Sequence, residues 1–475
     1  MTRYIRLCPA KCALDLGDGS ERGEYVCQDY ILNVLGRPHR AVNIMYTYYP
    51  NDEQWPMRIS QACAGLDVGF AWDYPYDDYP PFADDGLQFE QMRDIRRHGQ
   101  DVMLTITMDC SVDDTHLVKI AKSLAKFGRM MLRINHECNG NWFTHNKRFS
   151  YEEIADFFVR FSKIIKREAP NIRTVFCAGL AGEEKDDPVT VECEDVFAPA
   201  YREADVWSAD KYIALHYGWP YDIAEAGGGS YESADPLKLF GRYERTYKRL
   251  KQLFGEKPFI QAELNADGDV TGPLFQAIPV MAYYKKVKDE NATWLTGISM
   301  YQFRDRGRLG LEIEDPNNSC VGIKQPILDE YKKVLCDPYF MPQMVPGDET
   351  VFPATLRWGG SEDADGIEIS FELEGTPTFC EVTLQKNLSL MMEFCGRWFY
   401  KAAGVATIDL MSAFFEKKPV GKCSVSLRIF ATPPDGVNTE TCENWMTDQY
   451  YDMNEEPVFR IRYNAPAKYP EIDDE

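Results

Sequence analysis

The sequence predicts a (β/α)8 TIM barrel followed by a small C-terminal antiparallel β-sandwich, and three observations support this fold class. Between about residues 40 and 340, eight short apolar runs alternate with longer segments of helical pattern. Runs that are apolar almost throughout are typical of parallel strands buried on both faces. Beyond a proline-rich stretch, apolar residues recur with a period of two. A doubly wound open sheet is the alternative, but no glycine-rich turn follows the first run to support it.

The eight apolar runs are expected to form the barrel strands in chain order. Each is short enough for one strand and is followed by a polar or helical segment. They are VNIMYTYY (42–49), DVGFAW (67–72), DVMLTITM (101–108), RMMLRIN (129–135), RTVFCAG (173–179), DVWSADKY (205–212), PFIQAEL (258–264) and GISMYQF (297–303).

The segments between the runs carry helix signals. In residues 150–170, Ser150 and Glu153 form a capping box, apolar residues recur at helical spacing, and Pro170 ends the pattern. Residues 113–128 repeat the pattern and stop at Gly128. Such helices are expected to surround the barrel.

A change of pattern marks the second domain. Four prolines between Pro338 and Pro353 indicate a linker. In residues 366–375, 423–429 and 459–463 apolar residues alternate with polar ones, as in half-buried antiparallel strands. The expected organisation is an N-terminal extension packed on the barrel (1–40), a catalytic barrel (41–340) and a β-sandwich (350–475).

Composition restricts the partners. With a formal net charge of -23 at pH 7, the chain repels polyphosphate, so neither nucleic acid nor an anionic membrane is expected as a partner. The first twenty residues contain no apolar signal segment, which predicts a cytoplasmic protein, or a secreted one if a signal has been removed. The 14 cysteines are scattered and are expected to be free thiols. The oligomeric state is left open.

Two glutamates follow strands that face each other across a barrel. His136 and Glu137 end the fourth run, and Glu263 ends the seventh. Catalytic residues of such barrels lie at the carboxyl ends of the strands. Two carboxylates there could act as acid/base and nucleophile in glycoside cleavage. One buried glutamate alone would be explained as well by a structural ion pair.

A zinc site is the alternative that a His-Glu pair suggests. A helical metalloprotease motif needs a second histidine four residues after the first, where this chain has Gly140. His145 lies nine residues on, outside that spacing. Neither a metal nor an organic cofactor is therefore expected.

The segment RINHECNGNWF resembles the strand-four motif of glycoside hydrolase family 26, the β-mannanase type of the clan A barrels, or of a neighbouring family. The residues that match, in order, are Arg133, His136, Glu137, Asn139, Gly140, Trp142 and Phe143. The resemblance implies that Glu137 is the acid/base, that His136 contacts the sugar and that Trp142 lines the cleft. It also implies that Glu263 is the nucleophile and that Tyr212 hydrogen-bonds to it.

The chain departs from that family at two strands. Tyr301 and Phe303 stand where the family has its strand-eight tryptophan, and the third run ends in Met-Asp-Cys where a histidine is common. The resemblance implies substrate contacts at these positions in the family, so these departures are compatible with a sugar other than mannose.

Further aromatic and charged residues follow other runs. Aromatic rings stack on sugars and carboxylates accept hydroxyl hydrogen bonds, so these residues are candidates for substrate binding, the alternative being packing at the barrel rim. They are Tyr48, Tyr49, Trp72, Asp73, Tyr74 and Trp219, with His216 beside the last. Arg304, Arg306 and Arg308 could hold an anionic substrate group, although an ion-paired loop explains them better.

The leading prediction is a retaining β-glycoside hydrolase that acts on a β-linked oligo- or polysaccharide of mannan or glucan type by double displacement. A glycosidase for an anionic glycan is one alternative. A non-catalytic carbohydrate-binding barrel and a metal-dependent hydrolase are two others, because barrels host many chemistries.

Overall fold

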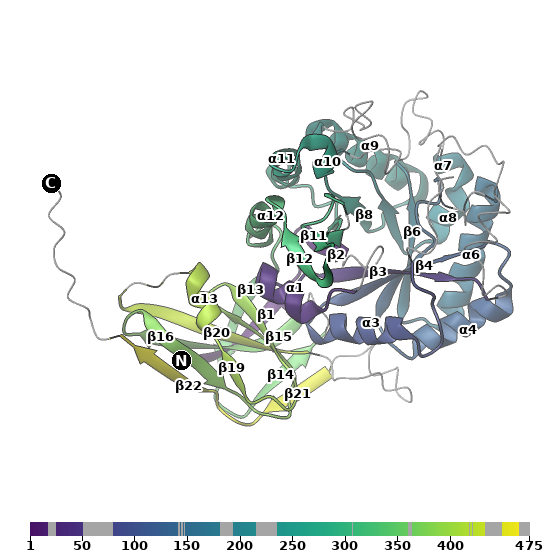
Figure 1. Cartoon of the computed structure of the whole chain (residues 1–475). Helices are drawn as coiled ribbons and strands as arrows, with labels where there is room; N and C mark the ends of the chain where they lie inside the picture. The colour runs from purple at the N-terminus through teal and green to yellow at the C-terminus, as the bar shows by residue number, and fades with distance from the viewer. Residues whose placement is uncertain are drawn as a thin grey trace, which may run out of the picture.

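The computed structural model describes most of the chain, in two parts that Figure 1 shows side by side. The residues it describes are 1–17, 25–50, 79–140, 143, 146, 148–180, 193–214, 235–305, 307–359, 363–417, 419, 421–432 and 449–464. Among them, no helix combines the length and the apolar character needed to cross a membrane.

The first part is a closed barrel of parallel strands, which confirms the predicted fold class. Closure comes from pairing of the last strand with the first, with Ala13 opposite Gly297. The strands, in order around the barrel, are β2 (Ala13–Gly17), β3 (Ala41–Tyr48), β4 (Asp101–Met108), β5 (Met130–Ile134), β6 (Ile172–Ala178), β7 (Val206–Ala209), β8 (Phe259–Leu264) and β9 (Gly297–Met300).

Two expectations about the strands were wrong. The first strand is β2, within the residues assigned to an N-terminal extension, and eight strands close the barrel without residues 67–72, which lie outside the described residues. The sequence did not predict β2 as a strand, because β2 is short and contains the charged residue Asp15, unlike the apolar runs. Asp15 is buried because Arg40 pairs with it, its Nε lying 2.8 Å from Asp15 Oδ1. β5 is still the fourth strand and β8 the seventh.

Helices cover the outside of the barrel (Figure 1). In α6 the capping box of Ser150 and Glu153 is present, and in α4 the Asp113 side chain accepts hydrogen bonds from the first turn. The helices of this part are α1 (Gln28–Leu35), α3 (Leu87–Arg97), α4 (Asp114–Ala125), α6 (Tyr151–Glu168), α7 (Cys193–Val196), α8 (Ala198–Glu203), α9 (Pro236–Phe254), α10 (Gly268–Thr271), α11 (Ala277–Asp289) and α12 (Ile327–Leu335).

The second part consists of two antiparallel sheets that share one apolar core, as predicted for a sandwich. The larger sheet contains β1 (Thr2–Cys8), β13 (Gln343–Glu349), β14 (Ala354–Trp358), β15 (Ala364–Leu373), β17 (Leu390–Phe394), β18 (Arg397–Lys401), β20 (Cys423–Ala431) and β21 (Gln449–Met453). The smaller contains β16 (Pro377–Thr383), β19 (Thr407–Asp409) and β22 (Val458–Tyr463), and the helix α13 (Met411–Glu416) follows β19.

The N-terminal strand belongs to this second part. β1 lies between β13 and β15 and pairs with both, so the chain begins in the sandwich before it enters the barrel. The expectation that residues 1–40 pack on the barrel as one extension was therefore wrong. Strand pairing between segments more than 330 residues apart leaves no local signal in the sequence.

The larger sheet packs against the amino-terminal end of the barrel strands. The Trp398 backbone N–H donates to the Gly36 carbonyl at 2.7 Å, and the Arg129 side chain, just before β5, donates to the Gly359 carbonyl. Side chains from β1, α1, β17, β18 and β20 form an apolar cluster there. The carboxyl-terminal end of the barrel, where the candidate site lies, is on the opposite side.

Candidate active site

Four acidic or aromatic side chains gather at the carboxyl ends of three barrel strands. Glu137 follows β5, Asp210 and Tyr212 follow β7, and Glu263 lies near the end of β8. Asp210 and Glu263 are buried. Carboxylates are rarely buried without partners, so their surroundings determine what they can do.

The loop after β5 is held in an uncommon backbone conformation. Asn135 and Glu137 have φ angles of 58° and 43°, in the left-handed region that costs a residue with a side chain about 1–3 kcal/mol. Asn135 Oδ1 accepts the Met108 backbone N–H at 2.9 Å. Asn146 Nδ2 donates to the Glu137 carbonyl at 2.8 Å and to the His136 carbonyl at 3.2 Å. These side chains hold Glu137 in place against the strain.

Three donors surround the Glu263 carboxylate. The Tyr212 hydroxyl donates to Oε2, and His136 Nε2 lies 3.2 Å from Oε1. Arg133 Nη2 lies 3.6 Å from the same oxygen. Hydrogen bonds and positive charge favour the ionised form of a carboxyl group. The expected bond from Tyr212 to Glu263 is thus present in the structure.

Arg133 reaches Glu263 from inside the barrel. It is fully buried in β5, and its Nε donates to Thr105 Oγ1 at 2.7 Å. Burial acts to lower the pKa of this guanidinium, but the neighbouring Cys177 and Glu263 act to raise it, and the pKa is raised overall. Arg133 therefore stays charged beside the carboxylate.

Glu137 approaches the same nitrogen of His136 as Glu263 does. Its Oε2 is 3.9 Å from His136 Nε2, the nitrogen that is 3.2 Å from Glu263 Oε1. These two distances place Glu137 Oε2 within roughly 7 Å of Glu263 Oε1, which is compatible with the ~5–5.5 Å separation of carboxyl groups in retaining glycosidases.

Asp210 is the partner of Glu137 that the sequence did not predict. Burial raises the pKa of Asp210, while a hydrogen bond from the Glu137 side chain and the charge of Arg133 lower it. Two carboxyl groups can share a hydrogen bond only while one of them is protonated. We therefore expect Glu137 and Asp210 to hold one proton between them, with Glu137 as the donor.

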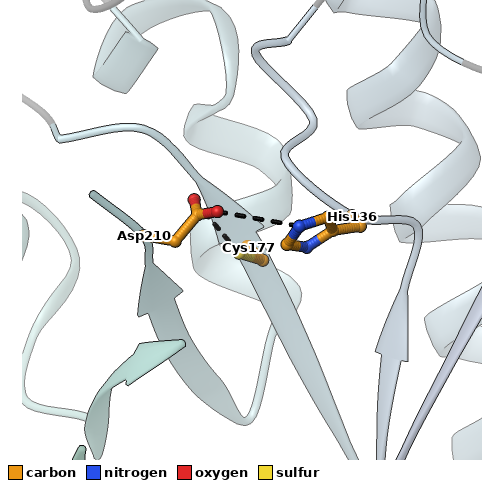
Figure 2. A group of neighbouring side chains, drawn as sticks. All are labelled: His136, Cys177 and Asp210. Carbon is orange, nitrogen blue, oxygen red and sulfur yellow. Dashed lines mark hydrogen bonds and ion pairs between the residues drawn. The ribbon is translucent and has the colours of Figure 1, made fainter. Parts of the chain in front are cut away.

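Asp210 also belongs to a cluster with His136 and Cys177, shown in Figure 2. Ligand atoms of the three side chains lie within 4.8 Å of one another, as a metal site would require. Burial raises the pKa of the Cys177 thiol well above its usual range, whereas a zinc ligand must be a thiolate. His136 Nε2 already faces Glu263 at 3.2 Å. The residues present therefore fit a hydrogen-bonded network better than a metal centre.

The remaining predicted binding residues are placed as follows. Tyr301, just after β9, meets the Tyr212 ring edge-on with 5.5 Å between ring centroids. Asn139 is buried, and its carbonyl accepts the Tyr151 hydroxyl at 2.7 Å, so its backbone supports the loop. Trp72, Asp73, Tyr74, Trp142, His216 and Trp219 lie outside the described residues.

Two other groups at the rim have structural partners. The Tyr48 hydroxyl lies 2.9 Å from His116 Nδ1, which supports rim packing. Arg304 pairs with Glu312 at 3.0 Å in the small sheet of β10 (Arg304–Asp305), β11 (Glu312–Asp315) and β12 (Asn318–Lys324). Arg308 Nε lies 3.1 Å from Asp269. Arg304 and Arg308 are therefore both ion-paired within the protein, in agreement with the structural interpretation of this loop. Arg306 lies outside the described residues.

Sequence reasoning missed Asp210 and Asn146. Asp210 directly follows the last residue of β7, so the strand-end rule that selected Glu137 and Glu263 would also have found it. Asn146 offered no such signal, because its role depends on how the loop folds back on itself.

Comparisons with known proteins give a likeness in structure but not in sequence. No family model matches the chain, and no curated protein matches it. Among solved structures, a family 26 β-mannanase from Bacteroides ovatus matches at 12% identity and a TM-score of 0.43, over 70% of this chain and 90% of that one.

Two further solved structures are similar at the same level. A family 26 endo-β-1,4-mannanase from Bacillus sp. JAMB-750 matches at 14% identity and a TM-score of 0.44, over 70% of this chain and 87% of that one. A family 51 α-L-arabinofuranosidase from Bifidobacterium longum matches at 11% identity and a TM-score of 0.45, over 89% of this chain and 97% of that one. At these identities and TM-scores, no family is established for the chain.

Proposed function

We propose that this protein is a retaining β-glycoside hydrolase whose catalytic pair is Glu137 and Glu263. The observation that carries the proposal is the placement of two carboxyl groups at the carboxyl ends of β5 and β8, with one oxygen of each within roughly 7 Å of the other and in different surroundings. Glu263 faces three donors, and Glu137 shares a hydrogen bond with a buried carboxyl group. Where two neighbouring carboxyl groups have surroundings that move their pKa values apart, one typically acts as the acid and the other as the base or nucleophile.

The proposed reaction has two steps. In the first, Glu263 attacks the anomeric carbon while Glu137 gives its proton to the leaving glycosidic oxygen, which leaves a glycosyl ester on Glu263. In the second, Glu137 takes a proton from water, the water oxygen attacks the anomeric carbon, and Glu263 is released as the carboxylate. Arg133, His136 and Tyr212 stabilise the charge on Glu263 at the start and at the end.

The test is turnover of aryl β-glycosides and β-linked oligosaccharides of mannan and glucan type, with the first-formed anomer read by proton NMR. A first-formed β-anomer supports the proposal, and a first-formed α-anomer refutes the retaining mechanism. Glu263→Gln should abolish turnover. Glu393→Gln is the matched control, because Glu393 is also buried but pairs with Arg428 in the sandwich, far along the chain from the site.

The cluster of His136, Cys177 and Asp210 motivates a second candidate, a metal-dependent hydrolase. Elemental analysis of the purified protein separates the two. One zinc per chain, with activity lost to a chelator and restored by zinc, would favour the metal enzyme. Full glycosidase activity in the presence of chelator would favour the carboxylate pair. A protein that binds oligosaccharides and turns over none of the substrates would be the non-catalytic alternative.

A further inference from the structure

A cavity of about 60 Å³ lies between the barrel and the sandwich, at the opposite end of the barrel from the candidate active site. Its barrel side includes Arg37 and His39, just before β3, and its sandwich side includes Met391, Trp398 and Phe430. A cavity of roughly 10–15 Å³ already holds one water, so this one accommodates several non-hydrogen atoms.

Arg37 is the unusual member of the lining. Only 5% of its surface is exposed, and among the described residues its guanidinium has no hydrogen-bond or ion-pair partner. Its guanidinium carbon lies over the Trp398 ring, 5.8 Å from the ring centroid. Burial lowers the pKa of this guanidinium, which reflects the cost of an unneutralised buried charge. An anion bound beside Arg37 would neutralise this charge and offset that cost.

The other charged groups nearby are already matched. Arg40 pairs with Asp15, and the ring nitrogens of His98 face the Asp94 carbonyl and the Asp29 carboxylate.

Three further ionisable neighbours remain. Burial raises the pKa of the Cys336 thiol above its ordinary value of 9.0, so this neighbour carries no charge near pH 7. Burial lowers the pKa of His39 to about 3, so His39 is neutral near pH 7. Glu393, the carboxylate that acts on Arg37, is paired with Arg428. The cavity therefore offers one uncompensated positive charge.

We propose that this cavity binds a small monocarboxylate with a short apolar chain. The carboxylate would pair with the guanidinium of Arg37, whose planar fork suits two parallel hydrogen bonds. The apolar chain would lie against Trp398 and Met391. A single charge favours a monoanion over a phosphate dianion, and the mostly apolar lining favours a ligand with an apolar part. The bound acid would link the barrel to the sandwich.

The test uses propionate as the probe, with chloride at equal ionic strength as the reference and inorganic phosphate as the competing class. Propionate should raise the melting temperature of the full chain in a saturable manner, because a ligand that binds only the folded state stabilises it. Calorimetric titration should show one site per chain. A response to phosphate equal to or larger than that to propionate would overturn the assignment to a monocarboxylate.

Two variants locate the effect. Arg37→Met should remove the response to propionate and, without ligand, should melt no lower than the natural chain, because it removes an unpaired buried charge. Arg173→Met is the matched control, because Arg173 is exposed at the start of β6 and its loss changes the net charge equally. The control should keep the full response. An equal response in Arg37→Met and the natural chain would refute the proposal.

A measurement on the natural chain covers the case in which Arg37→Met does not fold. Crystals soaked in 3-bromopropionate should show the bromine by anomalous scattering beside Trp398, with the carboxylate at Arg37. Bromine found only elsewhere would refute the site.

Discussion

Replacement of Asp210 by asparagine tests whether this buried carboxyl group keeps a proton on Glu137. The substitution retains shape and removes the negative charge that accepts the Glu137 hydrogen bond. If Glu137 is the general acid, its protonated form must persist to the working pH of the enzyme. Without the charge of Asp210, Glu137 should lose its proton at lower pH.

The size of the effect follows from the hydrogen bond. A hydrogen bond to a charged partner contributes about 1.5–3 kcal/mol, and one between neutral groups about 0.5–1.5 kcal/mol. Asp210→Asn should therefore reduce the stabilisation of protonated Glu137 by about 1–1.5 kcal/mol. Since 1.36 kcal/mol corresponds to one pKa unit, the alkaline limb of the kcat/KM profile should move down by about one unit. The assay is the pH profile of kcat/KM on an oligosaccharide whose leaving group needs protonation.

Asp109→Asn is the control for that profile. Asp109 is as buried as Asp210, at 6% exposure each, and also follows a barrel strand, but it pairs with Arg148 at 2.6 Å. The control should leave the alkaline limb in place. An unmoved limb in Asp210→Asn, or the same movement in both variants, would refute the role assigned to Asp210.

A stability measurement checks the same carboxyl group without reference to activity. Burial raises the pKa of Asp210 above its ordinary value of 3.8. The protonated carboxyl group therefore contributes its full stabilisation of the folded state below about pH 4. This stabilisation is lost as the pH rises through the pKa of Asp210 in the folded state, because the buried group then becomes charged. Asp210→Asn should therefore melt above the natural chain at neutral pH, and the two should converge near pH 4. A variant that is less stable at neutral pH would contradict this sign.

Four further outcomes are expected. Tyr212→Phe removes a donor to the ionised Glu263 and should lower kcat roughly 10–100-fold with an unchanged melting temperature, which stopped assays and calorimetry would check. Glu137→Ala should reduce turnover far less for an aryl glycoside with an acidic phenol than for an oligosaccharide; equal losses would contradict the acid role. A chain ended at Cys336 lacks both strands that pair with β1 and should aggregate, so a soluble and fully active product would refute the structural role of the sandwich. Trp142→Ala should weaken oligosaccharide binding by about 2–4 kcal/mol if its ring stacks on sugar, and unchanged kcat/KM would retire that idea.

Local patterns in the sequence were sufficient for the fold class and for selecting the two glutamates proposed as the catalytic pair. Helical spacing with a capping box predicts α6, because the cap and the apolar face lie within one segment. Apolar runs predict seven of the eight barrel strands, because most residues of a strand buried on both faces are apolar. The rule that chemistry lies at the carboxyl ends then leads to Glu137 and Glu263.

Tertiary structure decided what depends on partners distant in the sequence. Asp15 makes β2 look unlike a core strand, and only its pairing with Arg40 allows its burial. β1 joins strands more than 330 residues away, and Asp210 meets Glu137 only where β5 and β7 end together in the closed barrel. The lack of a partner for Arg37 emerges only once both parts enclose it. A buried charge is matched or left unmatched by neighbours in space, whereas sequence patterns record only neighbours along the chain.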